Sequence, residues 1–485
     1  MADAIVVGAG PNGLAAAVVL ARAGLEVEVL ERAPTPGGGA RTREVTLPGF
    51  RHDTGSAVHP MALASPFFRA FDLAAHGVDL RHPDIAYGHP LEGGRAALAH
   101  RDLDRTAAGL GVDGPAWRAL LGPLARAWPR LVEVALGDLR SLPPARAWTT
   151  AAHLGAAVVE QGGPAWNLRF RTEEAAALLT GVAAHAVAPP RAPGPAAAGL
   201  VLAALAHGVG WPVPRGGSQS IVDALVADLL AHGGRVRTGV DVTDLRELPP
   251  TTAVLLDVAP TGLLRLAGDR LPDGYATALR RYRHRGAASP VHFALAGPVP
   301  WAAPGLDRAG TVHVGGDRAQ MMAAERSVAR GRFASRPYVL VSQPSVVDDT
   351  RAPAGRHVLW TYAHVPVGSV PDAGEAVQRR LEEFAPGFSD LVLARTALGA
   401  AALAADDPTL VGGDIACGAP TPWQLAFRPV PRWDPYRTPL DGVYLCSAAT
   451  APGPGVHGLC GVNAARRVLR HHFGIRVARD GLTPA

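Results

Sequence analysis

Three segments of the sequence space their glycines as G-x-G-x-x-G, a pattern that lets a backbone loop approach phosphate groups where a strand turns into a helix. The first copy, Gly8, Gly10 and Gly13, follows an apolar strand expected at 4–7 and precedes an alanine-rich helix expected at 14–23. Gly8 permits a tight turn, Gly10 lets the backbone approach a pyrophosphate, and Gly13 lets the helix pack closely on the strand. This copy predicts phosphate binding at the start of a helix.

An acidic residue at the end of the next expected strand completes the pattern. The segment LEVEVLE alternates as a strand does and ends in Glu31, eighteen positions after Gly13. A carboxylate in this place accepts hydrogen bonds from a ribose hydroxyl. The N-terminal segment therefore predicts a dinucleotide site.

The two other copies differ in their flanking residues. No apolar strand precedes the copy at 109–114 and Pro115 follows it, so we expect a loop that opens a helix. The C-terminal copy at 453–458 lies between the expected strand GVYLCSAAT and a helix expected at 458–470, but no acidic residue follows to hold a second ribose. One FAD molecule that runs from the N-terminal loop to the C-terminal helix explains both ends. The dipole of that helix would face flavin N1 and C2=O, where negative charge gathers on reduction.

Composition limits the remaining chemistry. At 485 residues the chain exceeds the size of a single core, about 250–300 residues, so at least two domains are expected. The sequence contains no lysine, which excludes Schiff-base and pyridoxal phosphate chemistry and P-loop phosphate binding. The three cysteines have no metal-ligand spacing, and we expect no metal site.

Charge and hydropathy favour a cytoplasmic protein that does not bind nucleic acid. The net charge is only +5, no secretory signal precedes the first expected strand, and the longest apolar run, 196–206, is too short to cross a bilayer. The basic cluster at 280–285 is either a solvated helix end or a contact for an anionic membrane surface or substrate, which leaves a weak peripheral membrane contact open. The oligomeric state stays open as well.

Several further motifs resemble the flavin amine oxidase and phytoene desaturase superfamily, in its phytoene-dehydrogenase-like branch. They are ERAPTPGGGARTRE at 31–44, GFRHDTGSAVHP at 49–60, the segment 211–242 that begins WPVPRGGSQS, GGDI at 412–415, RPVP at 428–431 and YRTPLDGVYLCSAAT at 436–450. The resemblance covers nearly the whole chain. It is specific for FAD and the fold, and only weakly specific for the substrate.

The resemblance implies an α/β fold with a doubly wound FAD-binding domain of the glutathione reductase type. Segments 1–75, 208–265 and 405–485 would form this domain, and an inserted α+β substrate domain would comprise 76–207 and 266–404. FAD would be bound noncovalently. The cofactor-binding residues expected are Gly8, Gly10, Pro11, Asn12, Gly13, Glu31, Arg32, Gly38, Gly39, Arg41, Gly55, Ser56, Ala57, Val242 (on a strand that meets the adenine), Ala448, Gly455, Val456 and His457.

Two histidines are candidates for proton transfer. His292 lies in PVH, where relatives commonly show Lys-x-Asp, and strand alternation places it opposite in face to Val291 and Phe293. His59 follows the Gly55–Ser56 loop, which should pass the flavin ring. A structural role is open for both. At His457 the backbone N–H is expected to matter more than the imidazole.

The resemblance and the residues together predict an FAD-dependent oxidoreductase that dehydrogenates or desaturates a small organic substrate by hydride transfer to flavin N5. The Ala, Leu and Val-rich stretches 151–206 and 390–405 could line an apolar cavity, and relatives act on isoprenoids, so we expect an apolar small-molecule substrate. A flavin amine oxidase is a first alternative, disfavoured by the missing lysine and the few aromatic residues. A redox-neutral flavoprotein isomerase or a non-catalytic flavin-binding protein is a second.

Overall fold

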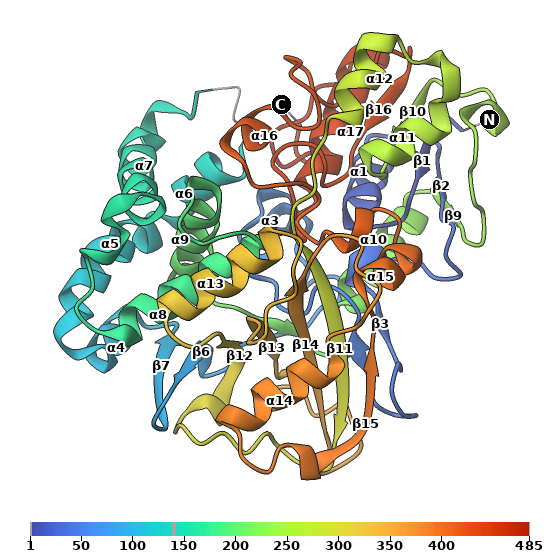
Figure 1. Cartoon of the computed structure of the whole chain (residues 1–485). Helices are drawn as coiled ribbons and strands as arrows, with labels where there is room; N and C mark the ends of the chain where they lie inside the picture. The colour runs from blue at the N-terminus through green and yellow to red at the C-terminus, as the bar shows by residue number, and fades with distance from the viewer. Residues whose placement is uncertain (1, 138–141, 485) are drawn as a thin grey trace.

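A parallel sheet of five strands forms the half of the molecule that contains the N-terminal glycine loop (Figure 1). The computed structural model describes residues 2–137 and 142–484. In spatial order the strands are β16 (Val443–Leu445), β10 (Ala253–Leu256), β1 (Ala4–Val7), β2 (Val27–Leu30) and β9 (Arg235–Arg237). Such a sheet must be covered on both faces, which agrees with the continuous apolar runs of β1 and β10.

Helices cover both faces of this sheet. Ala4 and Val6 pack in one core cluster with α1 (Pro11–Arg22), α10 (Gln219–Ala231) and α17 (Leu459–His472). Ile5 and Val7 point the other way, into a cluster with α11 (Pro260–Ala267) and α12 (Asp273–Arg280). The alternation of side chains along β1 thus fills two separate cores, as a doubly wound domain requires.

A mixed sheet of seven strands forms the second half. Its spatial order is β15 (Val392–Ala397), β11 (Ala287–Leu295), β14 (His357–Val365), β13 (Val339–Ser342), β12 (Ala309–Val314), β6 (Ile85–Leu91) and β7 (Arg95–His100). Val291 and Phe293 on β11 pack against α14 (Gly374–Phe384). The opposite face carries Ala288, Pro290 and His292, so the predicted facing of His292 is confirmed.

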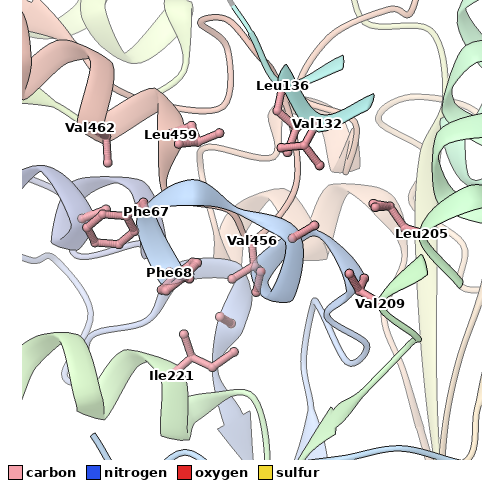
Figure 2. Packing of buried hydrophobic residues seen from close by; sticks show 14 of the residues in the cluster. Phe67, Phe68, Val132, Leu136, Leu205, Val209, Ile221, Val456, Leu459 and Val462 are labelled. Atoms are coloured by element: carbon pink, nitrogen blue, oxygen red, sulfur yellow. The ribbon is translucent and has the colours of Figure 1, made fainter. Parts of the chain in front are cut away.

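A layer of helices covers the second sheet at one end and joins it to the first half. It comprises α4 (Leu103–Gly109), α5 (Gly114–Arg126), α6 (Trp128–Ala135), α7 (Trp148–Gly162), α8 (Glu173–Ala183) and α9 (Pro193–Gly208). Figure 2 shows Leu136 and Leu205 from this layer near Phe68 of α3 (Pro66–Phe71) and Val456. One continuous core therefore connects the helical layer to the half that contains the five-stranded sheet.

The remaining elements are short, except for the twelve-residue helix α13 (Arg318–Ala329). They are β3 (Thr42–Arg43), β4 (His52–Asp53), α2 (Pro60–Ala64), β5 (Leu80–Arg81), β8 (Val213–Pro214), α13, α15 (Ala400–Asp406) and α16 (Pro422–Phe427), with single-turn 3₁₀ segments between them. Within the described ranges, no helix combines the length and the apolar character that crossing a membrane demands.

The predicted fold class is confirmed, and the three glycine signatures differ as expected. The first joins β1 to α1, although α1 begins at Pro11 rather than at 14 because proline suits the first helical turn. The middle copy links α4 to α5. There Asp113 is buried and accepts hydrogen bonds from the backbone N–H groups of Arg171 and Thr172, so it is a structural anchor. The five-segment domain division remains our proposal.

Candidate functional site

One cavity of about 880 Å³ extends from the first glycine loop to the space between the helical layer and the seven-stranded sheet. The predicted cofactor residues that line it are Gly8, Gly10, Pro11, Asn12, Glu31, Arg32, Gly38, Gly39, Arg41, Gly55, Ser56, Ala57, Val242, Ala448, Gly455 and Val456. Gly13, His457 and His292 are not among the lining residues. These segments, far apart in the sequence, meet because the carboxyl ends of β1, β2 and β10 lie at one edge of the parallel sheet.

Steric contacts explain the glycines of the first loop. Gly8 has a φ of +101°, and a Cβ added to Gly10 would lie 2.7 Å from Oδ2 of Asp257. A Cβ at Gly13 would lie 2.2 Å from the carbonyl oxygen of Gly8. Gly13 therefore serves the close packing of helix on strand, as predicted, and does not face the cavity.

Glu31 directly follows β2, and its carboxylate holds both the loop after β1 and the segment after β2 in place. Its Oε2 accepts a hydrogen bond of 2.7 Å from the N–H of Ala9, and its Oε1 accepts one of 2.7 Å from the N–H of Ala33. The carboxylate also lines the cavity, where further lone pairs can accept from a hydroxyl. Val242 lines the same end but lies beyond β9 in a segment without strand pairing, so its expected place on a strand is wrong.

Asp257, which the sequence analysis missed, lies against the glycine loop at the end of β10. Its Oδ2 accepts a hydrogen bond of 2.9 Å from the N–H of Gly13. Burial raises the pKa of Asp257 from 3.8 to about 7, with smaller contributions from Asp407 and Glu31. The position of Asp257 at the end of an apolar strand, next to the predicted sheet edge, was the signal available in the sequence.

Asp406, the last residue of α15, accepts hydrogen bonds from arginines of the motif at 31–44. It accepts hydrogen bonds of 2.9 Å from Arg41 and 2.8 Å from Arg43, and Arg32 donates to its carbonyl oxygen at 3.3 Å. Asp406 also lines the cavity, so these arginines already have a carboxylate partner there. Arg41 and Arg32 remain at the cavity wall, where a phosphate could compete for their remaining N–H groups.

The opposite end of the predicted cofactor site is formed by the loop before α17. Gly453 and Gly455 have φ values of +119° and +127°, which favour glycine. His457 is fully buried, and its Nδ1 accepts a hydrogen bond of 3.0 Å from the N–H of Leu459, the first residue of α17. The imidazole of His457 therefore caps the helix, whereas we expected its backbone N–H to matter.

His59 is a buried imidazole at the cavity wall, and its protonation follows from its partners. Ser218 Oγ has one proton, which it donates to the carbonyl oxygen of Ser56 at 2.6 Å, so Oγ accepts from His59 Nε2–H at 2.8 Å. Neutral His59 then has a bare Nδ1, and this buried atom has no hydrogen-bond partner among the described residues. Burial lowers the pKa of His59 to about 4, and the ring is neutral at pH 7.

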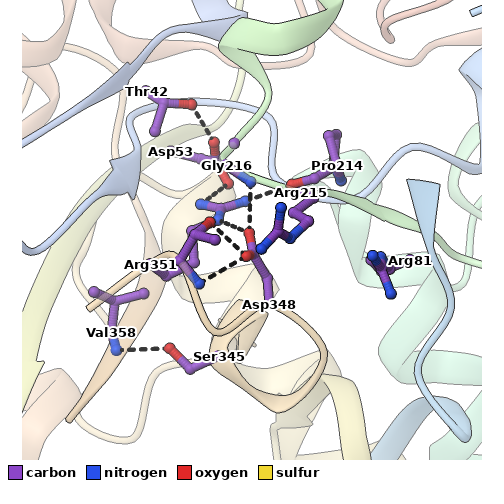
Figure 3. A network of polar contacts seen from close by, with 12 residues as sticks. Thr42, Asp53, Arg81, Pro214, Arg215, Gly216, Ser345, Asp348, Arg351 and Val358 are labelled. Carbon is purple, nitrogen blue, oxygen red and sulfur yellow. Dashed lines mark hydrogen bonds and ion pairs between the residues drawn. The ribbon is translucent and has the colours of Figure 1, made fainter. Parts of the chain in front are cut away.

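A buried ionic network of Asp53, Arg351 and Asp348 (Figure 3) supports Ser218 and thereby His59. Asp53 accepts hydrogen bonds of 2.8 Å from the N–H of Ser218, 2.7 Å from Thr42 Oγ1 and 2.9 Å from Arg351. Arg351 also donates to Asp348 at 2.7 Å, and its side chain is 0% exposed. Arg351 and Asp348 come from the loop between β13 and β14, so the network joins the two halves of the molecule.

His292 lies on the cavity face of β11 but outside the cavity. It pairs across the sheet with Trp360, and its ring meets that of His52 with centroids 5.3 Å apart. Ala288 and Pro290, earlier on the same strand, do line the cavity. Strand alternation indicated the face of His292 but not its distance along the strand.

The part of the cavity between the helical layer and the seven-stranded sheet is apolar and partly aromatic. Its helical side carries Val134, Leu136, Leu154, Val201 and Leu202, and its sheet side carries Leu340, Trp360 and Tyr362, with Trp211 and His185 nearby. Aromatic residues are few in the sequence, but Trp211, Trp360 and Tyr362 all line the cavity. Trp211 is far from the other two in the sequence, so the sequence gave no signal that it would share the cavity with them.

Comparisons with known proteins agree with this architecture. The family described as NAD(P)-binding Rossmann-like domain matches residues 6–74. Pyridine nucleotide-disulfide oxidoreductase domain-containing protein 2 of Rattus norvegicus is 28% identical over 96% of this chain and 93% of its own length. Phytoene dehydrogenase of Streptomyces griseus is 29% identical over 98% of this chain and 96% of its own length.

Among solved structures, cyclohexylamine oxidase from Brevibacterium oxydans aligns with a TM-score of 0.56 at 15% identity, covering 96% of this chain and 98% of that one. This likeness concerns the fold. The comparisons confirm the resemblance and the fold class that the sequence motifs predict.

Proposed function

We propose that this chain, an oxidoreductase of the flavin amine oxidase and phytoene desaturase superfamily, binds FAD noncovalently and dehydrogenates or desaturates a predominantly apolar small molecule. The observation that carries the proposal is the single continuous cavity. It joins a dinucleotide-binding loop to a glycine-lined end and then to an apolar chamber. An elongated cofactor that lies along this cavity, with a substrate beyond its far end, would contact these three regions in that order.

The residues present fit FAD. Glu31 would accept from the adenosine ribose, Val242 would contact the adenine, and the loop at Gly8 and Gly10 would receive the pyrophosphate at the start of α1. At the far end, Gly455 lines the cavity without a side chain and has a φ of +127°, so its backbone would allow close approach of a planar ring. When bound, FAD supplies an acceptor for a hydride from a C–H bond.

The chamber excludes water and positions the substrate. Its apolar side chains, such as Val134, Leu154 and Val201, offer no hydrogen bonds that would retain water. A substrate held there against the flavin end meets the positional requirement of hydride transfer. Since hydride loss leaves a cationic substrate, formation of a C=C bond also requires a base for the neighbouring proton.

We assign the base role to His59 in place of His292. His59 lines the cavity, and its Nδ1 carries no proton and has no hydrogen-bond partner among the described residues. Ser218 and Asp53 hold the other side of the ring in place. His292 is enclosed outside the cavity and has no access to a substrate there.

One observation in the structure favours the amine oxidase alternative, and one feature of the sequence argues against it. Trp211, Trp360 and Tyr362 line the chamber and could contact a cationic amine. No lysine is available anywhere in the sequence to assist reaction of a reduced flavin with oxygen. Dehydrogenation of a C–C bond therefore remains the favoured reaction.

The proposal is tested with purified protein under argon. We expect a yellow protein that releases one FAD per chain on acid denaturation, and flavin bleaching by terpenes or medium-chain ketones but not by amines. The His59→Ala variant should keep the flavin spectrum and slow bleaching by about 10²–10⁴-fold, the usual contribution of acid–base catalysis. The His292→Ala variant should bleach at the wild-type rate. Bleaching by amines alone, or a colourless protein that cannot be reconstituted, would contradict the proposal.

A further inference from the structure

Two imidazoles form a pair at the wall of the apolar chamber. His185, in the short turn Ala184–Ala186 between α8 and α9, faces the cavity, and His313 lies on β12 behind it. Their Nε2 atoms are 2.8 Å apart, and the rings cross at 86° with centroids 5.0 Å apart. His313 belongs to the same row across the sheet as Leu340 and Tyr362, which line the chamber.

The pair can share only one proton between the two Nε2 atoms, because both rings are neutral. Burial lowers the pKa of His185 to about 3 and the pKa of His313 well below its usual value. Either His313 Nε2–H donates to His185, or His185 Nε2–H donates to His313. The first arrangement leaves the proton of His185 on Nδ1, and the second leaves the proton of His313 on Nδ1.

The surroundings of His313 decide between the two arrangements. His313 is 0% exposed, and its Nδ1 is a buried atom without a hydrogen-bond partner among the described residues. A buried N–H with no acceptor is rarer in proteins than an under-satisfied acceptor. We therefore place the shared proton on His313 Nε2, which leaves His185 as the acceptor in the pair.

His185 then presents an N–H group to the chamber. It is half-buried, and its Nδ1 is neither enclosed nor bonded within the described part of the chain. Its neighbours at the wall are apolar or aromatic, such as Trp211, whose ring lies 5.5 Å from that of His185. A pure hydrocarbon in this chamber would leave the N–H group desolvated and without an acceptor, which is unfavourable.

Building on the proposed function, we propose that His185 Nδ1–H donates a hydrogen bond to an oxygen atom of the substrate. The substrate class is then an apolar molecule that carries a carbonyl or a comparable oxygen acceptor, not an unsubstituted hydrocarbon. His185 determines specificity, and His313 is a positioning residue that holds it in the donating tautomer.

The proposal is tested by calorimetric titration of the purified holoprotein with three C12 probes: 2-dodecanone, dodecane and 1-dodecanethiol. The ketone accepts hydrogen bonds only, the alkane neither donates nor accepts, and the thiol is a polarisable but weak acceptor. We expect the ketone to bind about 10-fold more tightly than the alkane, the value of one net hydrogen bond, with the thiol close to the alkane. His185→Phe should abolish the advantage of the ketone and bind the alkane at least as tightly as the wild type does, because it removes the N–H group that an alkane leaves without an acceptor. Retained alkane binding also shows that the chamber is intact.

Two further variants and three possible outcomes keep the inference falsifiable. His185→Asn keeps a donor near the position of Nδ1 and should retain most of the ketone preference. His153→Phe, on α7 and outside the cavity lining, is the matched control and should bind as the wild type does. An unchanged ketone preference in His185→Phe, or equal wild-type affinity for ketone and alkane, overturns this inference and leaves the proposed function unaffected. If neither probe binds, the apolar chamber of the proposed function fails, and the inference fails with it.

Discussion

At the scale of single residues, two carboxylates beside the same glycine loop differ in their surroundings. Glu31 lines the cavity and accepts hydrogen bonds from two backbone N–H groups. Asp257 is buried behind the loop and has a raised pKa. Because a charged Asp257 would repel a pyrophosphate at this loop, its neutral form is the one that suits the proposed cofactor.

Replacement of Glu31 by alanine should weaken FAD retention by about 10- to 100-fold, since a hydrogen bond to a charged group contributes about 1.5–3 kcal/mol. Glu31→Gln keeps an acceptor and should lose less. Flavin content after dialysis measures both. Glu28→Ala on the same strand removes an ion pair with Arg237 outside the cavity and is the control. Equal losses at both positions would contradict the role of Glu31.

Asp257→Asn should change how stability depends on pH. The folded chain raises the pKa of Asp257 from 3.8 to about 7, so its stabilising contribution is full below pH 3.8 and is lost as the pH rises to 7. The melting temperature of apo Asp257→Asn relative to wild type should therefore increase between pH 4 and 7 and then level off. Asp244→Asn, at an exposed site where Arg246 lowers the carboxyl pKa, should show no such rise. A pH-independent difference for Asp257→Asn would refute the assignment.

At the scale of elements, the contact between α1 and α17 brings the two ends of the chain together. A Cβ added to Gly461 would lie 1.8 Å from the carbonyl oxygen of Asn12. The helices can approach this closely only because Gly461 has no side chain. The same contact places the loop at Gly455 opposite the glycine loop at Gly10, on one cavity.

Gly461→Ala should lower the free energy of unfolding by about 1–3 kcal/mol, the usual cost of overpacking, and should also reduce flavin content. Thermal melts and flavin absorbance measure the two effects. Gly155→Ala on α7 is the matched control, because no atom lies within 4 Å of its added Cβ. That change should be neutral or stabilise by about 0.5–1 kcal/mol. Wild-type stability in Gly461→Ala would show that α17 can shift without consequence.

At the scale of the whole molecule, the network of Arg351, Asp53 and Asp348 joins the seven-stranded sheet to the segment that carries His59. All three side chains are buried. The apolar chamber lies between the helical layer and the seven-stranded sheet, and His59 also lines the cavity. The network therefore holds the segment that carries His59, our proposed base, against the sheet that forms one side of the chamber.

Arg351→Leu should lower the free energy of unfolding by about 3–5 kcal/mol, because it leaves two buried carboxylates without their cation. Denaturant melts measure this loss. The control Arg246→Ala breaks an exposed ion pair with Asp244 and should leave the free energy of unfolding almost unchanged, because solvent screens such pairs. A small effect of Arg351→Leu would mean that water or another cation reaches the carboxylates.

The sequence alone determined the local features of this protein. The strand–loop–helix at Gly8–Gly13, the acidic end at Glu31 and the structural nature of the 109–114 copy all depend on residues close together in the chain. Backbone sterics and alternating hydrophobicity act over such short distances, and they can be interpreted from the order of residues. For the same reason the face of His292 was predictable.

Only the tertiary structure decided which distant residues share the cavity. Asp257, Trp211, Trp360, Tyr362 and His185 meet there because two sheets and a helical layer pack with a particular geometry. His292, on the correct face, was excluded by its place along β11, and His457 became a helix cap. Tautomers and pKa values were likewise decided by the fold, since they depend on burial and on partners supplied by remote segments.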